Sequence, residues 1–306
     1  MADGQPVELD GAAVSKGPGP LRAVSAVGVY LGKQYPPGQA ASVGLTAIAA
    51  YLVYGRAAGH YHLNGHGLAA AALVVVLFLQ YRLTDDISTS LNSELGGGAA
   101  IPARPKFLAL ALVASLPLEF LLEPHAQALL VALSALGLMA IGSLGLAAGK
   151  RSAALRFAAR VIFVELVPVA IFTYVYFAWR AANGRSLSVA AVVAVIGGLI
   201  AGFQFWKWSR DLGDEPSERI YFVSWPKVRG VLVLLAALGA AFNGLLYHEA
   251  KLSVAYLVYI LAVCIYFMAL VAPRGQSNDT QPWWSGLAFP VLLQVGLYVQ
   301  LIALAA

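Results

Sequence analysis

The sequence predicts an all-α polytopic membrane protein with nine transmembrane helices. Of its 306 residues, 60% are hydrophobic and only 11% are charged, whereas about a quarter of the residues in typical soluble domains carry a charge. A chain with this composition cannot cover a water-facing surface with polar side chains. Its apolar segments recur along almost the whole length, which favours helices that cross a lipid bilayer.

The nine segments follow a polar beginning. Residues 1–36 hold a Gly/Pro-rich tail and a mildly apolar piece, which we interpret as a cytoplasmic tail and a short interfacial helix. A transmembrane helix needs roughly 20 apolar residues. Apolar runs near this length fall at residues 37–55, 67–81, 107–122, 126–148, 157–179, 187–206, 230–247, 252–272 and 285–306. The second and third runs are short by this measure, and together the nine form one transmembrane domain, residues 37–306.

Basic residues set the predicted orientation. With a cytoplasmic N-terminus, 15 of the 20 Lys and Arg side chains fall in cytoplasmic segments, as the positive-inside rule requires. The bilayer thereby accounts for the net charge of +5, and we expect no nucleic-acid partner. The same orientation places two acidic clusters on the cytoplasmic side. All the histidines fall in or beside outer loops: His60, His62, His66, His125 and His248.

The acidic cluster after the sixth run reads "RDLGDEPSE". Arg210, Asp214 and Glu218 are spaced by four residues, and Asp211 stands beside them, so a helix would carry a cation and three carboxylates on one face. Closely spaced carboxylates repel one another unless a cation lies among them. A divalent ion that prefers oxygen ligands, such as Mg²⁺, would relieve this repulsion.

The cluster after the second run reads "RLTDDISTSLNSE". Asp85 and Asp86 share a helical face with Thr89 and Ser93, and Arg82 lies one turn earlier. Hydroxyl groups therefore stand where further carboxylates would strengthen a metal site. Because charges near helix ends cost much less than charges at the bilayer centre, both clusters can also be read as solvated loop charges.

Both clusters lie on the same predicted side of the membrane, and basic residues accompany each of them. Arg82 and Arg104 are near the first cluster, and Lys207 and Arg210 are near the second. Mg²⁺ held by carboxylates beside Arg and Lys makes a suitable cradle for a diphosphate. An apolar bundle beneath such a cradle would suit a long isoprenoid tail.

These features resemble the UbiA superfamily of intramembrane prenyltransferases, whose members carry two aspartate-rich motifs after the second and sixth helices. In "RDLGDEPSE" the acidic positions are filled by Asp211, Asp214 and Glu218, and an Arg replaces the leading Asn. The first motif keeps Asp85 and Asp86 but has hydroxyl residues where acids are expected. The resemblance covers nearly the whole chain after the tail.

Further segments are similar to the same superfamily. Arg104 and Pro105 in "IPARPK" match an Arg-Pro pair that follows the first motif in many members, and "LGKQYPP" and "RSAALRFAARVIFVELVPVAIF" look like a bacterial branch. The resemblance implies helices around a central cavity, Mg²⁺-dependent binding of an isoprenyl diphosphate, and ionisation to an allylic cation. It also implies that an acceptor, often an aromatic ring, captures this cation.

The resemblance assigns roles to particular residues. The implied metal ligands are Asp85, Asp86, Asp211, Asp214 and Glu218, of which Asp86, Asp211 and Asp214 are the catalytic acids. The residues implied to hold the diphosphate are Arg82, Arg104, Lys207 and Arg210. Metals and basic side chains together stabilise the negative charge that develops on a departing pyrophosphate.

Aromatic residues flank the two motifs and are candidates for lining the cavity: Tyr81, Phe203, Phe205, Trp206, Trp208 and Tyr221. A carbocation needs a dry cavity, where aromatic faces offer cation–π stabilisation. Aromatic side chains at membrane borders are more often interfacial anchors. Both interpretations stay open at this point.

Two acids and one loop fall outside these motifs. Glu119 lies close to the outer end of the third run, where we expect it to be solvated. Glu165 lies deeper, in the fifth run, and is either a general base for an acceptor or the partner of Arg160. The spacing in "HYHLNGH" permits metal binding, but no carboxylate or Cys accompanies it in the sequence, so an exposed polar loop is favoured.

Three other functions remain open. A terpene cyclase of the same fold would ionise the diphosphate without an external acceptor. The hydroxyl residues of the first motif also permit a weakened, isoprenoid-binding membrane protein that is not an enzyme. A transporter is less favoured, because it would place polar groups at the bilayer midplane in broken helices, whereas most charge in this chain collects at one face.

Overall fold

The structure is a computed structural model that describes residues 37–59, 62–93, 105–148, 152–210, 225–271 and 284–305. Within these ranges the chain is helical apart from short connections, and no strand occurs there. The helices are α2 (Pro37–Ala57), α3 (Gly65–Ser93), α4 (Pro105–Ser115), α5 (Pro117–Leu122), α6 (Ala126–Ala148), α7 (Ala153–Arg160), the π-helix η2 (Val161–Leu166), α8 (Val167–Asn183), α9 (Val189–Arg210), α10 (Trp225–Glu249), α11 (Val254–Val271) and α12 (Trp284–Ala305). The predicted tail and interfacial helix lie outside the described residues.

The chain is a multi-pass membrane protein. In its described part, 7 helices are long and apolar enough to cross a bilayer. Two more apolar helical segments, Leu108–Leu122 and Ala288–Ala303, are shorter. Each predicted apolar run coincides with one helix or with consecutive helices, so the positions of the runs are confirmed. The number of nine crossings stays a prediction.

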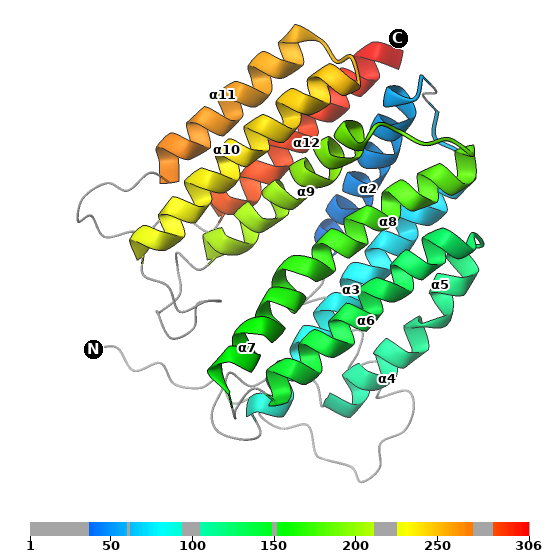
Figure 1. The fold of residues 1–306 in the computed structure, drawn as a ribbon, viewed down its shortest axis with the longest axis vertical. Helices are drawn as coiled ribbons and strands as arrows, with labels where there is room; N and C mark the ends of the chain where they lie inside the picture. Colours follow the sequence, from blue (N-terminus) through cyan, green and yellow to red (C-terminus); the bar gives the residue numbers. More distant parts are fainter. Residues whose placement is uncertain are drawn as a thin grey trace, which may run out of the picture.

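The helices form two adjoining groups (Figure 1). In one group α9 packs against α10 and α12, and α10 packs against α11; in the other, α3, α6 and α8 pack together, with α4 and α5 beside α3. Helix α2 contacts α3, α8, α9 and α12, so it joins the two groups. The first acidic motif therefore belongs to one group, and the helix that leads into the second motif belongs to the other.

The bundle has two ends, which we name by their ionisable residues. The acidic end carries the C-terminal ends of α3, α9 and α11 and the first residues of α4 and α10 (Figure 1). The histidine end carries the connections from α2 to α3, from α5 to α6, from α8 to α9 and from α10 to α11. Because neighbouring helices run antiparallel, the first acidic motif and the described histidines lie at opposite ends of the bundle.

Helix α3 is longer than the predicted run 67–81, and the first motif lies inside it rather than in a loop. The apolar pattern of α3 continues past the first aspartates because Leu83 and Ile87 pack against Leu108, Ala111 and Leu112 of α4. Burial of these side chains stabilises the extra turns. The helix therefore ends only at Ser93.

A proline and an interhelical hydrogen bond explain the π-helix η2. Pro168 has no N–H group, so the carbonyl of Val164 lacks its usual partner four residues later. Nε2 of Gln204 in α9 donates to that carbonyl at 2.8 Å, which satisfies a backbone group that lipid cannot. Glu165 lies in η2 and is partly exposed; both roles predicted for it stay predictions.

Candidate functional site

The first acidic motif forms a compact ion-pair cluster on α3. The guanidinium group of Arg82 pairs with both aspartates: Nη1 is 3.4 Å from Oδ2 of Asp85, and Nη2 is 3.2 Å from Oδ1 of Asp86. These pairs span three and four residues, the spacings at which side chains on a helix meet. All three residues therefore share one helical face.

The two aspartates differ in exposure. The Asp86 side chain is only 9% exposed, whereas that of Asp85 is 39% exposed. A buried carboxylate without a partner is costly because it loses its hydration, and Arg82 compensates Asp86 for this loss. Asp85 remains accessible from solvent at the acidic end.

Lys207 brings the end of α9 to this cluster. Its Nζ donates a hydrogen bond to the hydroxyl of Tyr81 and lies 4.9 Å from the centroid of the same ring. Tyr81 immediately precedes Arg82 in α3. A cation from one helix group therefore contacts the residue that precedes Arg82 in the other group.

An aromatic cluster adjoins these charges on the side of the bundle interior. The ring of Phe78 lies 5.5 Å from the rings of both Phe172 and Phe203, and Tyr81 stacks on Phe163 at 4.7 Å. We use the name aromatic cluster for Phe78, Tyr81, Phe163, Phe172, Phe203 and Trp206, which come from α3, η2, α8 and α9. Its members pack on one another in the bundle interior, where Phe78, Phe163 and Phe172 are buried.

Of the flanking aromatic residues that we named as candidates, Phe205 points elsewhere. It is 1% exposed and packs against Phe267 of α11 and Phe289 of α12, with ring centroids 5.7 and 4.2 Å away. Phe203 and Phe205 are two residues apart on a helix, so they face different neighbours. Phe205 thus holds α9 to its own helix group and does not belong to the aromatic cluster.

Several predicted site residues lie outside the described residues: Arg104, Asp211, Asp214, Glu218 and Tyr221. Arg210 is the last residue of α9, and Thr89 and Ser93 lie near the end of α3, but the side chains of these three are outside the described part as well. The structure therefore brings together Arg82, Asp85 and Asp86, and it places Lys207 against Tyr81, the residue before Arg82. The remaining assignments stay predictions.

Sequence reasoning missed the burial of Arg229, which it counted only as a cation on the cytoplasmic side. Arg229 is 6% exposed, and its Nη1 donates to the carbonyl of Val271 at 3.4 Å. Both residues lie at the acidic end, where α10 begins and α11 ends. The only signal in the sequence is its place one turn inside an apolar helix, which is an unusual site for a charge.

Glu119 is buried, so the prediction that it is solvated was wrong. Its exposure is 0%, and its Oε1 accepts a hydrogen bond from Gln80 of α3. Gln80 also donates to Ser115 Oγ at 3.0 Å. The short helix α5 turns Phe120 and Leu121 outward, to 61% and 76% exposure, and the same rotation turns Glu119 toward α3.

The histidine loop differs from its prediction in the same way. His62 is exposed as expected, but His66 lies in the first turn of α3 and approaches Glu123 and His125 of the connection between α5 and α6. A carboxylate does accompany these histidines in space, although none is near His66 in the sequence. The interpretation as an exposed polar loop therefore holds for His62 and is wrong for His66.

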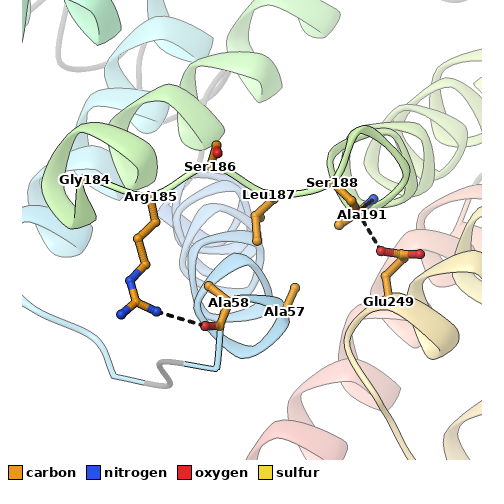
Figure 2. A pocket seen from close by; sticks show the side chains of 9 residues that line it. All are labelled: Ala57, Ala58, Gly184, Arg185, Ser186, Leu187, Ser188, Ala191 and Glu249. Atoms are coloured by element: carbon orange, nitrogen blue, oxygen red, sulfur yellow. Dashed lines mark hydrogen bonds between the residues drawn. The ribbon is translucent and has the colours of Figure 1, made fainter.

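A pocket of about 520 Å³ opens at the histidine end, and Figure 2 shows its lining. Arg185 donates to the carbonyl of Ala58 at 3.3 Å, and the Ser188 hydroxyl donates to Oε2 of Glu249 at 2.6 Å (Figure 2). The lining residues are Ala57, Ala58, Gly184, Arg185, Ser186, Leu187, Ser188, Ala191 and Glu249. None of them is a predicted site residue, so this pocket is not the predicted diphosphate site.

Asp85 and Asp86 fit the ligand chemistry of Mg²⁺. Their ion pairs with Arg82 use Oδ2 of Asp85 and Oδ1 of Asp86, and an ionised carboxylate has two oxygens with about four lone-pair sites. Mg²⁺ in phosphate-transfer sites takes one or two carboxylates and completes its shell with water and substrate phosphates. Two aspartates on one helical face can therefore serve as protein ligands without losing Arg82.

Comparison with known proteins gives one likeness in structure and none in sequence. No family model matches the chain, and no curated protein matches it. The chain is similar to a solved structure of digeranylgeranylglyceryl phosphate synthase in membranes, with a TM-score of 0.62 and 15% sequence identity. The match covers 91% of this chain and 99% of that chain. It confirms the predicted all-α membrane fold.

Proposed function

We propose that this chain, whose fold is that of a UbiA-superfamily membrane prenyltransferase, is an enzyme that transfers an isoprenyl group from an isoprenyl diphosphate to an acceptor within the membrane, with Mg²⁺ as cofactor. The observation that carries the proposal is the contact between Lys207 and Tyr81. This contact joins the ends of α3 and α9. One of these helices contains the first acidic motif, and the other leads into the second.

The contact places Lys207, which precedes the second motif by four residues, against the helix that carries the first motif. Asp211 follows Lys207 by four residues, which is roughly 6 Å of rise if the helix continued. Asp85 lies one turn beyond Tyr81, which Lys207 touches. We therefore assign the start of the second motif to the same diphosphate site as the first. The remainder of the second motif enters the proposal from its sequence.

Arg82 and Lys207 are the described cations that we assign to the diphosphate. Arg82 is oriented by Asp85 and Asp86, and Lys207 is oriented by Tyr81. Charged hydrogen bonds from such fixed donors stabilise a leaving pyrophosphate most strongly when its negative charge develops. Arg104 and Arg210 would complete this cationic set.

Mg²⁺, when bound, would neutralise part of the negative charge that develops on the leaving pyrophosphate. We assign its protein ligands to Asp85, Asp86, Asp211, Asp214 and Glu218, with Asp86, Asp211 and Asp214 as the catalytic acids. The burial of Asp86 and its ion pair with Arg82 hold that carboxylate in one orientation. Asp85 presents its oxygens on the more exposed side of the same face.

The aromatic cluster suits the other product of ionisation. When the C–O bond of the diphosphate breaks, both electrons leave with the pyrophosphate and an allylic cation remains. The rings of Phe78, Phe172 and Phe203 offer negative faces to such a cation. The burial of Phe78 and Phe172 within the bundle also excludes water, which would otherwise capture the cation.

The acceptor decides the reaction class. We favour an aromatic acceptor from the sequence resemblance, whereas the name of the similar structure denotes a glyceryl phosphate product. A terpene cyclase would ionise the same diphosphate and let the cation react within its own chain. The cationic groups and the aromatic cluster serve ionisation in each case, so only the products separate these reactions.

The test is a product analysis with the purified full-length protein in lipid vesicles. Labelled isoprenyl diphosphates of several chain lengths are supplied with Mg²⁺, and either an aromatic acceptor, a glyceryl phosphate acceptor or no acceptor is added. We expect pyrophosphate release and a prenylated acceptor. A hydrocarbon or alcohol formed equally well without an acceptor would identify a cyclase and replace our proposal.

Binding measurements test the site assignment separately. We expect Mg²⁺-dependent binding of the diphosphate by the unaltered protein, and its loss when Asp211→Asn and Asp214→Asn are combined. Binding that survives this double substitution would refute the assignment of the second motif. Absence of both binding and turnover with every chain length would refute the proposed activity itself.

A further inference from the structure

A carboxylate and two imidazoles meet at the histidine end, at the opposite end of the bundle from the acidic motif. Glu123 and His125 lie in the connection between α5 and α6, and His66 is the second residue of α3. One ligand atom from each residue lies within 4.8 Å of the other two. The two imidazole rings meet edge to face, with centroids 4.7 Å apart.

The carboxylate of Glu123 is completely buried, with a side-chain exposure of 0%. Its Oε1 accepts hydrogen bonds from the backbone N–H and Nδ1 of His125, both at 2.9 Å. Its Oε2 accepts from the hydroxyl of Tyr174 at 2.8 Å and lies 3.7 Å from Nε2 of His66. Every oxygen of this carboxylate therefore faces a polar group.

Both oxygens of Glu123 accept hydrogen bonds, but the negative charge of this carboxylate has no permanent cation beside it in the described part of the chain. In the described part of the chain, the basic groups within 4.0 Å of Glu123 are both imidazoles, which carry a charge only when protonated. A buried carboxylate that lacks a cation loses its hydration without recovering it. A bound metal ion would supply the positive charge and leave both imidazoles neutral.

We propose that His66, Glu123 and His125 bind a zinc ion that cross-links α3 to the α5–α6 connection at this end of the bundle. Two imidazole nitrogens and one carboxylate oxygen form a ligand set that zinc uses in proteins, whereas Mg²⁺ prefers oxygen alone. Ligand atoms around a tetrahedral zinc ion lie roughly 3.3 Å apart, given bonds of about 2.0–2.1 Å. His125 Nδ1 lies 2.9 Å from Oε1 of Glu123, and His66 Nε2 lies 3.7 Å from Oε2 of the same carboxylate. Each imidazole nitrogen is therefore near this separation from one of the two carboxylate oxygens.

The neighbours of the three ligands belong to α8. Tyr174 donates to Glu123 and would act as the partner that orients a metal-bound carboxylate. Nε2 of His66 lies 3.1 Å from the carbonyl of Ala178; since a carbonyl only accepts, this nitrogen carries the ring proton in that contact. Zinc binding through Nε2 of His66 and Nδ1 of His125 requires each neutral ring to carry its proton on its other nitrogen instead. The ion would link α3 to the α5–α6 connection beside α8.

The experiment measures metal retention by the full-length protein, purified in detergent without a polyhistidine tag. The protein is stripped with a chelator, incubated with Zn²⁺, freed of excess metal on a desalting column and analysed for metal by mass spectrometry. We expect one zinc ion per chain, a higher melting temperature with Zn²⁺, and no displacement by millimolar Mg²⁺. This outcome does not depend on prenyl transfer.

Variants separate a metal site from a cluster held by hydrogen bonds alone. Glu123→Gln and His66→Asn should lose the retained zinc, and Tyr174→Phe should weaken zinc binding by about 10- to 100-fold, as loss of an outer partner commonly does. His248→Asn is the matched control, because this histidine is 82% exposed and lies 3.5 Å from Glu249 at the same end. Its zinc content should equal that of the unaltered protein.

Two results would overturn the proposal. One is the absence of retained zinc in the unaltered protein, which would leave a hydrogen-bonded His–Glu cluster as the whole explanation. The other is equal zinc retention by the unaltered protein and by Tyr174→Phe, Glu123→Gln and His66→Asn. Gel filtration and Trp fluorescence confirm folding, and Tyr174→Phe, which removes only a hydroxyl, keeps the comparison valid where a ligand variant does not fold.

Discussion

Replacement of Asp86 by Asn tests the unequal burial of the two aspartates on α3. The Asp86–Arg82 pair is separated by 3.2 Å, and two unit charges at that distance attract by about 5 kcal/mol at an effective dielectric constant of 20. Removing one partner of a buried pair costs about 3–5 kcal/mol in known cases. Arg82 is 28% exposed and keeps Asp85, so we expect Asp86→Asn to lower the free energy of unfolding by about 3 kcal/mol.

Asp85→Asn is the matched control for this substitution. Its carboxylate pairs with the same arginine at 3.4 Å but is 39% exposed, and exposed ion pairs contribute only about 0–1 kcal/mol because water screens them. Unfolding in mixed detergent micelles, followed by Trp fluorescence, gives the free energy for each variant. A double-mutant cycle with Arg82→Gln isolates each pairwise energy.

The cycle should give a coupling of more than about 1.5 kcal/mol between Arg82 and Asp86, toward the range of buried pairs. For Arg82 and Asp85 it should stay below about 1 kcal/mol. Equal couplings, or a larger loss for Asp85→Asn, would mean that burial does not set the strength of these pairs. The structural distinction between the two aspartates would then be wrong.

Four further outcomes follow from the structure and from the proposed function. Lys207→Met, which removes the cation beside Tyr81, should weaken diphosphate binding about tenfold or more in a titration. Removal of Mg²⁺ with a chelator should abolish prenyl transfer, and added Mg²⁺ should restore it. Gly145→Leu should destabilise the protein by about 1–3 kcal/mol, because even a Cβ at this position would lie 2.7 Å from the Cβ of Ala159. Tyr256→Phe should cost about 0.6–1.7 kcal/mol in unfolding, since its hydroxyl donates to Asn243 at 2.7 Å.

Each of the three substitutions has a control in the same chain. Lys207→Arg keeps the charge and should retain most of the affinity; equal loss in both variants would point to packing. Gly137 lies on the same helix as Gly145 with nothing near an added Cβ, so Gly137→Ala should be neutral or stabilise by up to about 1 kcal/mol. Tyr266 is 59% exposed, and Tyr266→Phe should leave unfolding unchanged. Transfer that persists in chelator would contradict the assigned role of Mg²⁺.

The helical segments were predictable because the bilayer imposes a strong rule on sequence. Backbone polar groups must bond within each segment in lipid, so each crossing appears as an apolar run of nearly constant length. The end of α3 was not predictable in this way. Its last turns are polar on one face, and they stay helical because Leu83 and Ile87 pack on α4, a contact between segments that the sequence pattern does not reveal.

The candidate site was predictable in part for a related reason. Charged residues avoid the bilayer centre, so Arg82, Asp85, Asp86 and Lys207 are conspicuous at the ends of apolar runs. Their spacing along one helix gave the shared face of Arg82, Asp85 and Asp86. The opposite orientations of Phe203 and Phe205 were not predictable, because both sides of α9 are apolar and either ring suits either side.

The sequence by itself determined the membrane class, the position of each helix and the separation of the first acidic motif from the histidines, because these depend on which segments lipid accepts. Only the tertiary structure decided which polar groups meet. It placed Lys207 against Tyr81, Gln80 against Glu119, and His66 against Glu123. In lipid, helix faces that touch protein and faces that touch lipid are both apolar, so side-chain packing alone selects the neighbours.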